Sequence, residues 1–484
     1  MKIWVMNNKL DELTKRIAES FGRRAAEKSF KPGVRLLLPG LMIGLSLILA
    51  ARVTAQTFTT LHRFNGVSDG ANPYAGLILS GNALFGTSYS GGSSGWGTVF
   101  KVNTDGTGFM AIYSFTGASD GANPYAGLVL SGNTLYGTAY GGGASSNGTV
   151  FSVNTDGTGF TTLHSFTGGS DGANPYAALV LSGNSLYGTA YGGGRSDHGT
   201  VFKVNTDGNG FTTIYAFTGG SDGAYPQGRL VLSANTLYGT AAGGGLGRGG
   251  GTVFKVCTDG TAFSVIHSFS GPYGDVPRAG LILAGNTLYG TTAGSYRIAS
   301  SVFKVNTDGT AFTNMVSDWS GRHDGLILSG NTLYGTGGLG GSSSDGTVFA
   351  INTDGTGFAI VHSFAGGPSD GAYPFAGLIL SGNTLYGTAS GGGSSGRGTV
   401  FSLSLPQAQL TRSFSPKLTI IPSGANATIL TWPANYAGYA LQSTTNPVSA
   451  AAWTTVSPRP VVVNGQNVVT NPISGTLQFY RLSQ

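Results

Sequence analysis

Cysteine and glutamate are almost absent from this sequence. The 484 residues include a single cysteine, Cys257, so no disulfide can form within the chain. Every glutamate lies in the first 55 residues, and all 16 acidic residues after that point are aspartates. Glycoside hydrolases generally pair two carboxylates, commonly with glutamate as acid or base. The composition therefore argues against a glycosidase, although a pair of aspartates could still serve.

Signature motifs of metal and redox enzymes are also missing. No His-Glu-x-x-His or Cys-x-x-Cys sequence occurs after residue 55. We therefore predict no metal site and no cofactor. Cys257 stands in KVCTDG where other copies have KVNTDG, and we interpret it as a small residue tolerated in a turn.

Excess positive charge is confined to the start of the chain. Residues 1–55 hold ten Lys/Arg and four Asp/Glu, which equals the whole net charge of +6, and the remaining 16 basic and 16 acidic residues cancel. A neutral body is a poor match for a phosphate backbone. Nucleic acid is excluded as an expected partner.

The only long hydrophobic run belongs to a segment that is typical of an export signal. A basic stretch precedes LLLPGLMIGLSLILAA (Leu36–Ala51), and VTA (Val53–Ala55) offers the small residues that a signal peptidase needs. Cleavage after Ala55 would leave Gln56 first. We predict an extracellular or cell-envelope location.

The route of export stays open between three alternatives. GRRAAEK (Gly22–Lys28) resembles a twin-arginine signal, but Ala26 and Glu27 depart from the usual apolar pair. Ordinary secretion is the second alternative. The third is an uncleaved anchor, in which case this segment alone would contact the membrane.

Glycine and aromatic residues are abundant, and they recur in a repeated unit. The leucine of L(Y/F)GT recurs with spacings of 51, 51, 51, 51, 45 and 52, at Leu84, Leu135, Leu186, Leu237, Leu288, Leu333 and Leu385. A period near 50 with short strands indicates a β-propeller rather than a helical solenoid.

Each unit carries four strand signals. In one copy they are A (Ala126–Ser131), B (Thr134–Tyr140), C (Gly148–Thr155) and D (Gly159–Phe166). Gly-Asn between A and B and Asp-Gly between C and D predict tight hairpins. B and C are joined by a glycine-rich tip, and D reaches the next A through a crossing that contains proline.

The count of strands predicts a closed ring. A D-like segment, TFTTLHRF (Thr57–Phe64), precedes the first A strand, and no D follows the seventh C strand (Gly398–Leu405). The leading D can pair with the last C to complete seven blades of four strands, which removes exposed sheet edges. A framing in which each blade starts with D gives the same 28 strands without this clasp.

The repeated LSGNTLYGT…GGG…GTVFKVNTDGTGF resembles the GloVer tandem repeat over roughly residues 57–405. This resemblance implies an exported repeat protein with one of several C-terminal anchors, and it implies export more than any activity. FYRLSQ (Phe479–Gln484) departs from the pattern because it is not a hydrophobic anchor. The strand order also resembles kelch blades, and the C–D turn resembles an Asp-box.

The periodicity stops after a proline-flanked link, and six short strand signals follow. We predict an all-β fold, a seven-bladed β-propeller followed by a small C-terminal β-sandwich. The predicted parts are an export signal or anchor at 1–55, the propeller at 56–405, a linker at 406–416 and the β-sandwich at 417–484.

Recurring aspartates and histidines are interpreted as structural. Aspartates stand in TDG or SDGA turns, where the side chain can bond nearby backbone N–H groups: Asp105, Asp156, Asp207, Asp259, Asp308 and Asp354, with Asp69, Asp120, Asp171, Asp222 and Asp370. The alternative is a ring of carboxylates that binds cations, but its ligands would lie on different blades. His62, His164, His267 and His362 share one strand D position with Tyr113 and Tyr215, which suggests a flat ring with a polar tip.

The loops of units five and six break the repeat together and give the candidate binding site. They hold Tyr273, Arg278, Tyr296, Arg297, Trp319, Arg322, His323 and Asp324. The predicted function is an exported, non-catalytic scaffold that binds a glycan or a cell-surface protein. The alternative is an extracellular enzyme that acts on a glycan or another polymer.

Overall fold

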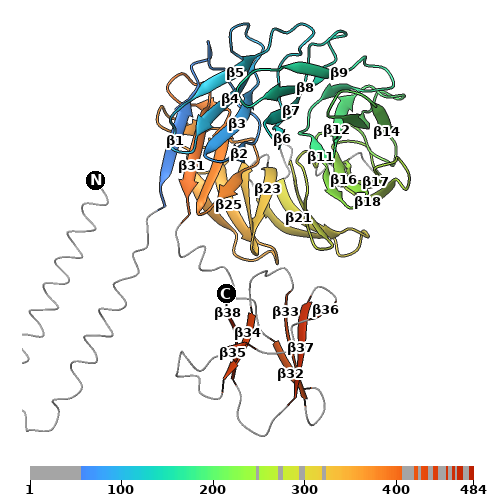
Figure 1. Cartoon of the computed structure of the whole chain (residues 1–484), viewed down its shortest axis with the longest axis vertical. Coiled ribbons are helices and arrows are strands. Elements are labelled where there is room, and N and C mark those ends of the chain that lie inside the picture. The colour runs from blue at the N-terminus through green and yellow to red at the C-terminus, as the bar shows by residue number, and fades with distance from the viewer. Residues whose placement is uncertain are drawn as a thin grey trace, which may run out of the picture. The chain divides into compact units, whose positions relative to one another are not determined.

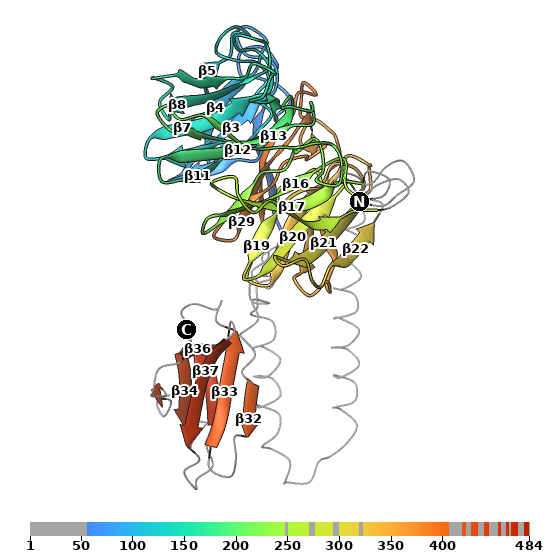
Figure 2. The same cartoon turned by 90° about the vertical axis from the view of Figure 1, so that its right-hand side faces the viewer.

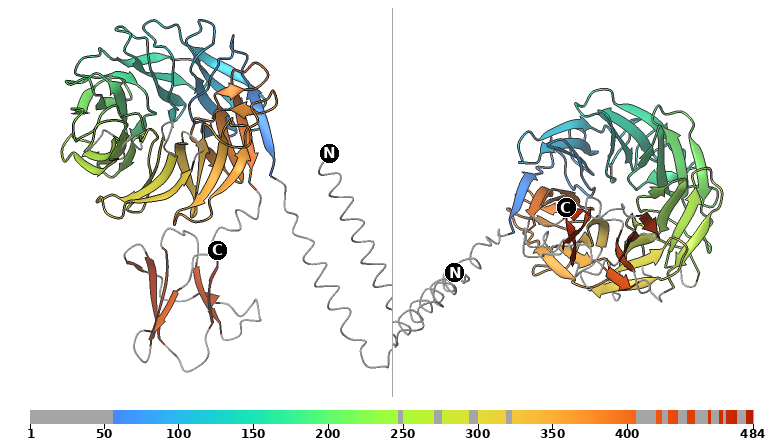
Figure 3. Two further views of the ribbon diagram at one scale, coloured as in Figure 1. Left: turned by 180° about the vertical axis from the view of Figure 1, so that it is seen from behind. Right: turned by 60° about the horizontal axis from the view of Figure 1, so that its bottom comes forward.

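Seven antiparallel β-sheets follow one another around a ring in the computed structural model of the chain (Figure 1; Figure 3, right). The structure describes residues 56–246, 250–270, 276–293, 300–318, 323–405, 419–422, 427–433, 440–444, 454–455, 461–463, 466–472 and 479–483. These residues form strands, turns and irregular segments. The sheets are the seven blades of a β-propeller, as the repeat predicts.

Each blade contains strands A, B, C and D in that spatial order. Blades 1 to 3 contain β2 (Ile78–Ser80), β3 (Ala83–Ser88), β4 (Thr98–Asn103) and β5 (Met110–Ser114); β6 (Val129–Ser131), β7 (Thr134–Ala139), β8 (Thr149–Asn154) and β9 (Thr161–Ser165); and β11 (Val180–Ser182), β12 (Ser185–Gly192), β13 (Thr200–Asn205) and β14 (Thr212–Ala216), with β10 (Ala173–Pro175) added beside β12.

The remaining blades repeat this order, and blade 7 takes its D strand from the start of the chain. Blades 4 to 7 contain β15 (Val231–Ser233), β16 (Thr236–Ala241), β17 (Thr252–Cys257) and β18 (Ser264–Ser268); β19 (Ile282–Ala284), β20 (Thr287–Thr292), β21 (Ser300–Asn306) and β22 (Thr313–Asp318); β23 (His323–Ser329), β24 (Thr332–Gly337), β25 (Thr347–Asn352) and β26 (Ala359–Ser363); and β28 (Ile379–Ser381), β29 (Thr384–Ala389), β31 (Thr399–Ser404) and β1 (Phe58–Arg63). Two short strands, β27 (Gly371–Ala372) and β30 (Gly391–Gly392), pair beside blade 7.

The first and last strands of the ring close it. β1 pairs antiparallel with β31, from Phe58 opposite Leu403 to Arg63 opposite Thr399. Figure 1 shows the blue β1 beside the orange β31. The predicted clasp is confirmed, and the framing in which each blade begins with its own D strand is wrong.

The two hairpins of each blade differ in their turns. Ser131 pairs with Thr134, so the A–B joint is the two-residue hairpin that was predicted. The C–D joint is longer than predicted, because β8 ends at Asn154 and β9 begins at Thr161. Asp156 shapes this longer turn by accepting bonds from the backbone N–H and the hydroxyl of Thr158, at 2.9 and 2.7 Å.

The hydrophobic core lies between neighbouring blades. One cluster joins Val150 of blade 2 to Leu186 and Phe202 of blade 3, and all three are fully buried. The glycine of LYGT follows from this packing, since a Cβ on Gly137 would lie 2.6 Å from the ring of Phe151. The same contact recurs in every blade, which explains the repeated glycine.

Aromatic stacking also joins the blades. The ring of His62 lies on Phe109 of the next blade with centroids 3.5 Å apart, and Tyr113 lies on Phe160 at 3.9 Å. The polar tips, His62 Nε2 and the Tyr113 hydroxyl, each lie 3.0 Å from an aspartate of the following crossing. The interpretation of this position as a flat ring with a polar tip is confirmed.

Among the described residues after 405, the structure has seven further strands: β32 (Thr419–Pro422), β33 (Ala427–Pro433), β34 (Ala440–Thr444), β35 (Thr454–Thr455), β36 (Val461–Val463), β37 (Gln466–Pro472) and β38 (Phe479–Ser483). They form sheets of four and three strands, and Figure 2 shows β33 beside β37. The sequence predicted six strands and missed β37. Leu430, Leu441 and Val469 form one buried cluster from both sheets, which supports the prediction of a β-sandwich.

Candidate functional site

The two faces of the ring carry different kinds of connection. The A–B turns meet the C–D turns on one face, as where Thr104 N–H donates to the Asn82 carbonyl at 2.8 Å. The B–C tips meet the D–A crossings on the other, as where Asn123 N–H donates to the Trp96 carbonyl at 2.8 Å. We call the second face the variable face, because its loops differ most between copies. This division between the faces is the one that the alternation of strands predicts.

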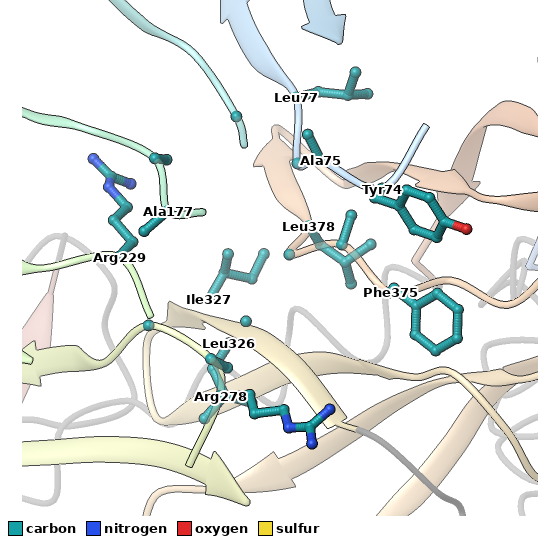
Figure 4. Close-up of a pocket in the computed structure, with 18 of the residues that line it drawn as sticks. Tyr74, Ala75, Leu77, Ala177, Arg229, Arg278, Leu326, Ile327, Phe375 and Leu378 are labelled. Carbon is teal, nitrogen blue, oxygen red and sulfur yellow. The ribbon is translucent and has the colours of Figure 1, made fainter. Parts of the chain in front are cut away.

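A cavity of about 350 Å³ lies where the crossings end and the A strands begin (Figure 4). The lining includes Ile282, Ile327 and Ile379 from three A strands, so strand A is the innermost strand of these blades. Two repeated positions matter here. The mouth position directly precedes the Ala-Gly-Leu of the repeat, and the inner position is the glycine of that tripeptide.

Aromatic side chains occupy the mouth position on one side of the cavity. Tyr74 stacks on Tyr125 with ring centroids 4.8 Å apart, and Tyr125 contacts Tyr176 at 4.0 Å. Phe375 continues the series on the other flank of Tyr74 at 6.1 Å. All four rings line the cavity and are half-buried. They form an aromatic arc over blades 7, 1, 2 and 3.

Polar side chains replace this arc on blades 4 and 5. Gln227 and Arg278 hold the mouth position, and Arg229 holds the inner position. The other blades have only glycine or alanine there: Gly76, Gly127, Ala178, Gly280, Gly325 and Gly377. The cavity is therefore aromatic on one side and basic on the other, and Figure 4 shows both arginines on its wall.

Neither arginine has a charge partner in the part of the chain that the structure describes. No acidic residue is among the described residues of the lining. The Arg229 side chain is exposed at the cavity, and desolvation by the protein around it lowers the pKa of its guanidinium. The Nε of Arg278 is buried without a hydrogen-bond partner, which costs about 1–3 kcal/mol unless a ligand satisfies it.

Two tyrosines of the variable face have a strained backbone. Tyr225 and Tyr373 both have φ of 58°, in the left-handed region that asparagine tolerates and bulky residues rarely adopt. Asparagine holds this position in earlier copies, and the Asn123 side chain donates to the Tyr89 carbonyl at 2.9 Å. Strain of this kind often marks functional sites.

The structure brings one of the eight predicted site residues into this cavity, namely Arg278. His323 and Asp324 begin β23, where they pair with Gly337 and Thr336. The other five predicted residues lie outside the described residues: Tyr273, Tyr296, Arg297, Trp319 and Arg322. The predicted cluster as a whole stays a prediction.

The sequence analysis missed the aromatic arc, Gln227 and Arg229. A usable signal was present, because the residue before Ala-Gly-Leu differs in chemistry between copies although proline stands directly before it in six of the seven copies. That residue is Tyr74, Tyr125, Tyr176, Gln227, Arg278, His323 or Phe375. Variation at one position of a constant frame is typical of a surface that binds something.

The recurring aspartates are structural, as interpreted. All six TDG aspartates accept the backbone N–H two residues ahead at 2.8–2.9 Å. The five SDGA aspartates accept backbone N–H groups four or five residues behind, as where Thr116 N–H donates to Asp120 at 2.8 Å. These bonds occupy the carboxylates of the proposed cation ring, and no metal-binding cluster occurs among the described residues.

Strand pairing defines the class of this molecule as a closed, seven-bladed β-propeller with a central cavity. The family model of the Gloeobacter/Verrucomicrobia repeat matches residues 48–249 and 220–401, so the chain belongs to this family. No curated protein matches the chain. In the part that the structure describes, no helix has the length and apolar character required to cross a membrane.

Several solved structures resemble the chain at low identity. An oligogalacturonate lyase from Vibrio parahaemolyticus is 12% identical, with 73% of this chain and 95% of that chain covered and a TM-score of 0.47. A putative 6-phosphogluconolactonase from Bacteroides uniformis is 18% identical over 63% and 88%, with a TM-score of 0.43. A chain of a nidogen/laminin complex is 14% identical over 57% and 90%, with a TM-score of 0.36. Similarity this low carries no argument about function.

Proposed function

We propose that this propeller is an exported, non-catalytic scaffold that binds a glycan or a cell-surface protein through its variable face. One observation carries the proposal. The frame of the seven blades is nearly constant, and the chemically different side chains gather around the cavity and on the tips of this face. Binding residues are commonly placed on loops that a rigid scaffold positions.

Exposed apolar residues support a binding role. Five of the eight large apolar residues that are exposed in the described part lie in tips or crossings of the variable face. They are Val67, Trp96, Leu246, Leu339 and Tyr373, with exposed fractions from 40 to 73%. Aromatic and apolar side chains of this kind are the usual anchors of interfaces.

The state of the carboxylates favours binding over catalysis. Hydrolysis of a glycan generally needs one carboxyl group as acid and another as base or nucleophile near the bond that breaks. The eleven repeated aspartates are bonded within their own turns, and the described lining of the cavity has no acidic side chain. Recognition is the chemistry that the remaining aromatic, amide and guanidinium groups can perform.

The location belongs to the same proposal. The basic and apolar segment within residues 1–55 is the reason to place the propeller outside the cytoplasm, and cell-envelope or extracellular polymers are then its natural ligands. We propose no nucleic-acid partner, because the residues after 55 have no net charge.

A pull-down against immobilised polysaccharides and cell-envelope fractions tests this function with the full chain. We expect retention without release of soluble products. The variant Trp96→Ala/Leu339→Ala/Tyr373→Ala should lose at least tenfold in affinity. Met110→Ala/Val265→Ala/Ile360→Ala is the matched control, because these exposed apolar residues lie on outer strands. Steady product formation would favour the enzyme instead, and equal binding by both variants would contradict the proposal for this face.

The loop cluster of units five and six is tested separately. Arg297→Ala/Trp319→Ala/Arg322→Ala removes its basic and aromatic groups. Weaker binding to the same fractions would support a site there. Unchanged binding by a folded triple variant would remove the cluster from the binding surface and leave the rest of the face in place.

A further inference from the structure

Two arginines of the cavity, Arg229 and Arg278, have no acidic partner among the described residues. Arg229 projects from a position that every other blade leaves to glycine or alanine, so blade 4 alone places a long cationic side chain there. Arg278 holds the mouth position of blade 5, the blade next to Arg229, and its Nε is buried without a hydrogen-bond partner. Gln227 adds an amide at the mouth position of blade 4. This side of the cavity has donors and no described acceptor that would neutralise the two charges.

The remaining wall offers a different surface. Leucine, isoleucine and alanine side chains of the A segments line it, and the aromatic arc covers the side of blades 7 to 3. Its volume of about 350 Å³ is at the lower end of the 300–1,000 Å³ that is usual for small-molecule pockets. The cavity can hold one small molecule, or one end of a larger one, with a charged group on one side and an apolar body on the other.

We propose that this cavity binds a small organic carboxylate with an apolar body. Arg229 would pair with the carboxylate, Arg278 would add positive charge from another side of the wall, and the apolar wall and the aromatic arc would hold the body (Figure 4). A planar guanidinium matches a carboxylate through two parallel hydrogen bonds, which makes arginine the usual partner for this group. The inference rests on the proposed binding function and names a ligand class for one part of the variable face.

The proposal explains why the repeat is broken at these positions. Glycine at the inner position lets neighbouring crossings approach closely, and a Cβ on Gly280 would lie 3.0 Å from the Cβ of Arg229. An arginine at this position places a positive charge without a described charge partner on the cavity wall, and a bound anion would complement it. The carboxylate of the ligand would supply hydrogen-bond acceptors for these guanidinium groups, which the described residues of the lining do not supply as acidic side chains.

Isothermal titration of the full chain with 3-phenylpropanoate tests the assignment, with 3-phenylpropanamide as the neutral match at the same ionic strength. We expect the carboxylate to bind at least tenfold more tightly than the amide. Arg229→Ala and Arg278→Tyr should each lower the affinity at least tenfold. Both variants should fold, because Ala178 and Tyr74 already occupy these positions in other blades. Arg195→Ala is the control, since Arg195 is an exposed arginine in a tip outside the cavity lining.

Three results would overturn the proposal. They are equal binding of carboxylate and amide, unchanged binding by Arg229→Ala and Arg278→Tyr relative to Arg195→Ala, and binding of methyl β-D-glucuronide without binding of 3-phenylpropanoate. Failure of this kind leaves the proposed function testable on its own. A chain whose Arg229→Ala variant still binds polysaccharide or envelope fractions would keep its scaffold role and lose the carboxylate site.

Discussion

Tyr373 has a backbone conformation that asparagine adopts more readily, so we predict that Tyr373→Asn stabilises the protein. The φ of 58° costs a bulky residue about 1 kcal/mol more than asparagine. The new amide can also donate to the preceding blade, as Asn123 does. We expect the midpoint of thermal unfolding, measured by calorimetry on the full chain, to rise by about 2–4 °C.

The reverse change supplies the control for this prediction. Asn123→Tyr introduces the strain at an equivalent crossing and should lower the midpoint. If Tyr373 is a binding residue, Tyr373→Asn should also weaken binding while it stabilises the fold, which is the trade-off expected where strain serves function. A lower midpoint for Tyr373→Asn would show that its contact with Phe375 outweighs the strain.

The stacked histidines predict a loss of stability in mild acid. Burial lowers the pKa of His62, His164 and His267 below the ordinary value of 6.5, and the bonds of the first two to aspartate oppose this only in part. The unfolded chain therefore binds more protons than the folded one as the pH falls below about 6.5. The contribution of these neutral, buried histidines to the free energy of unfolding is fully present above that pH and is progressively lost as the pH falls below it. Thermal unfolding at pH 7 and pH 5 should show a lower midpoint at pH 5.

Tyrosine gives a matched replacement for these histidines. Tyr113 and Tyr215 occupy the same position and stack in the same way, with centroids 3.9 and 3.7 Å from a phenylalanine of the next blade. The triple variant His62→Tyr/His164→Tyr/His267→Tyr should keep its midpoint between pH 7 and pH 5. A pH dependence equal to that of the parent would mean that other groups cause the loss.

The closing strand is the element that completes the ring, and its removal should be more damaging than any single core substitution. Phe64 and Phe115 hold equivalent places, are 1% and 0% exposed, and meet a strand C phenylalanine edge-on at 5.2 and 5.1 Å. Each change to alanine should cost about 3–5 kcal/mol. Deletion of Thr57–Phe64 should lower the thermal midpoint further and cause association, because it exposes the edge of β31.

Size-exclusion chromatography and thermal unfolding separate these outcomes. The two alanine variants should stay monomeric and melt at similar temperatures, since each keeps every strand in place. A deletion variant that melts like the parent and stays monomeric would contradict the role of β1 as the clasp.

Elements were predictable from the sequence where local chemistry decides them. Gly-Asn fixes a two-residue turn by backbone conformation alone, and the A–B hairpin is as predicted. The C–D turn is longer, because Asp156 accepts hydrogen bonds from Thr158 within the turn, and β9 begins only at Thr161. β37 was missed because QNVVTNP begins and ends with polar residues that are also common in loops.

At the scale of the whole molecule, the ring could be predicted because seven copies of the unit carry the same strand and turn signals. Strand count, closure and the two faces all follow from the repeat. The cavity could not be found in this way, because it is made by residues from different blades that meet only after the ring closes. Arg229 is an example, because it stands out only when it is compared with the glycine or alanine at the same position of the six other copies, which lie about 50 residues apart.

Closure of the ring by β1 also determines when during synthesis this strand can pair. The Thr57 N–H donates to the Ser404 hydroxyl, 347 residues later, so the strand of the ring that is synthesised first is among the last to find its partner. Contacts this distant in sequence slow folding. A nascent chain therefore carries an unpaired β1 until the last strand of blade 7 has been made. Under the export that we propose, ordinary secretion of an unfolded chain is the route that this delay would favour, because an unclosed ring would keep the chain competent for transport.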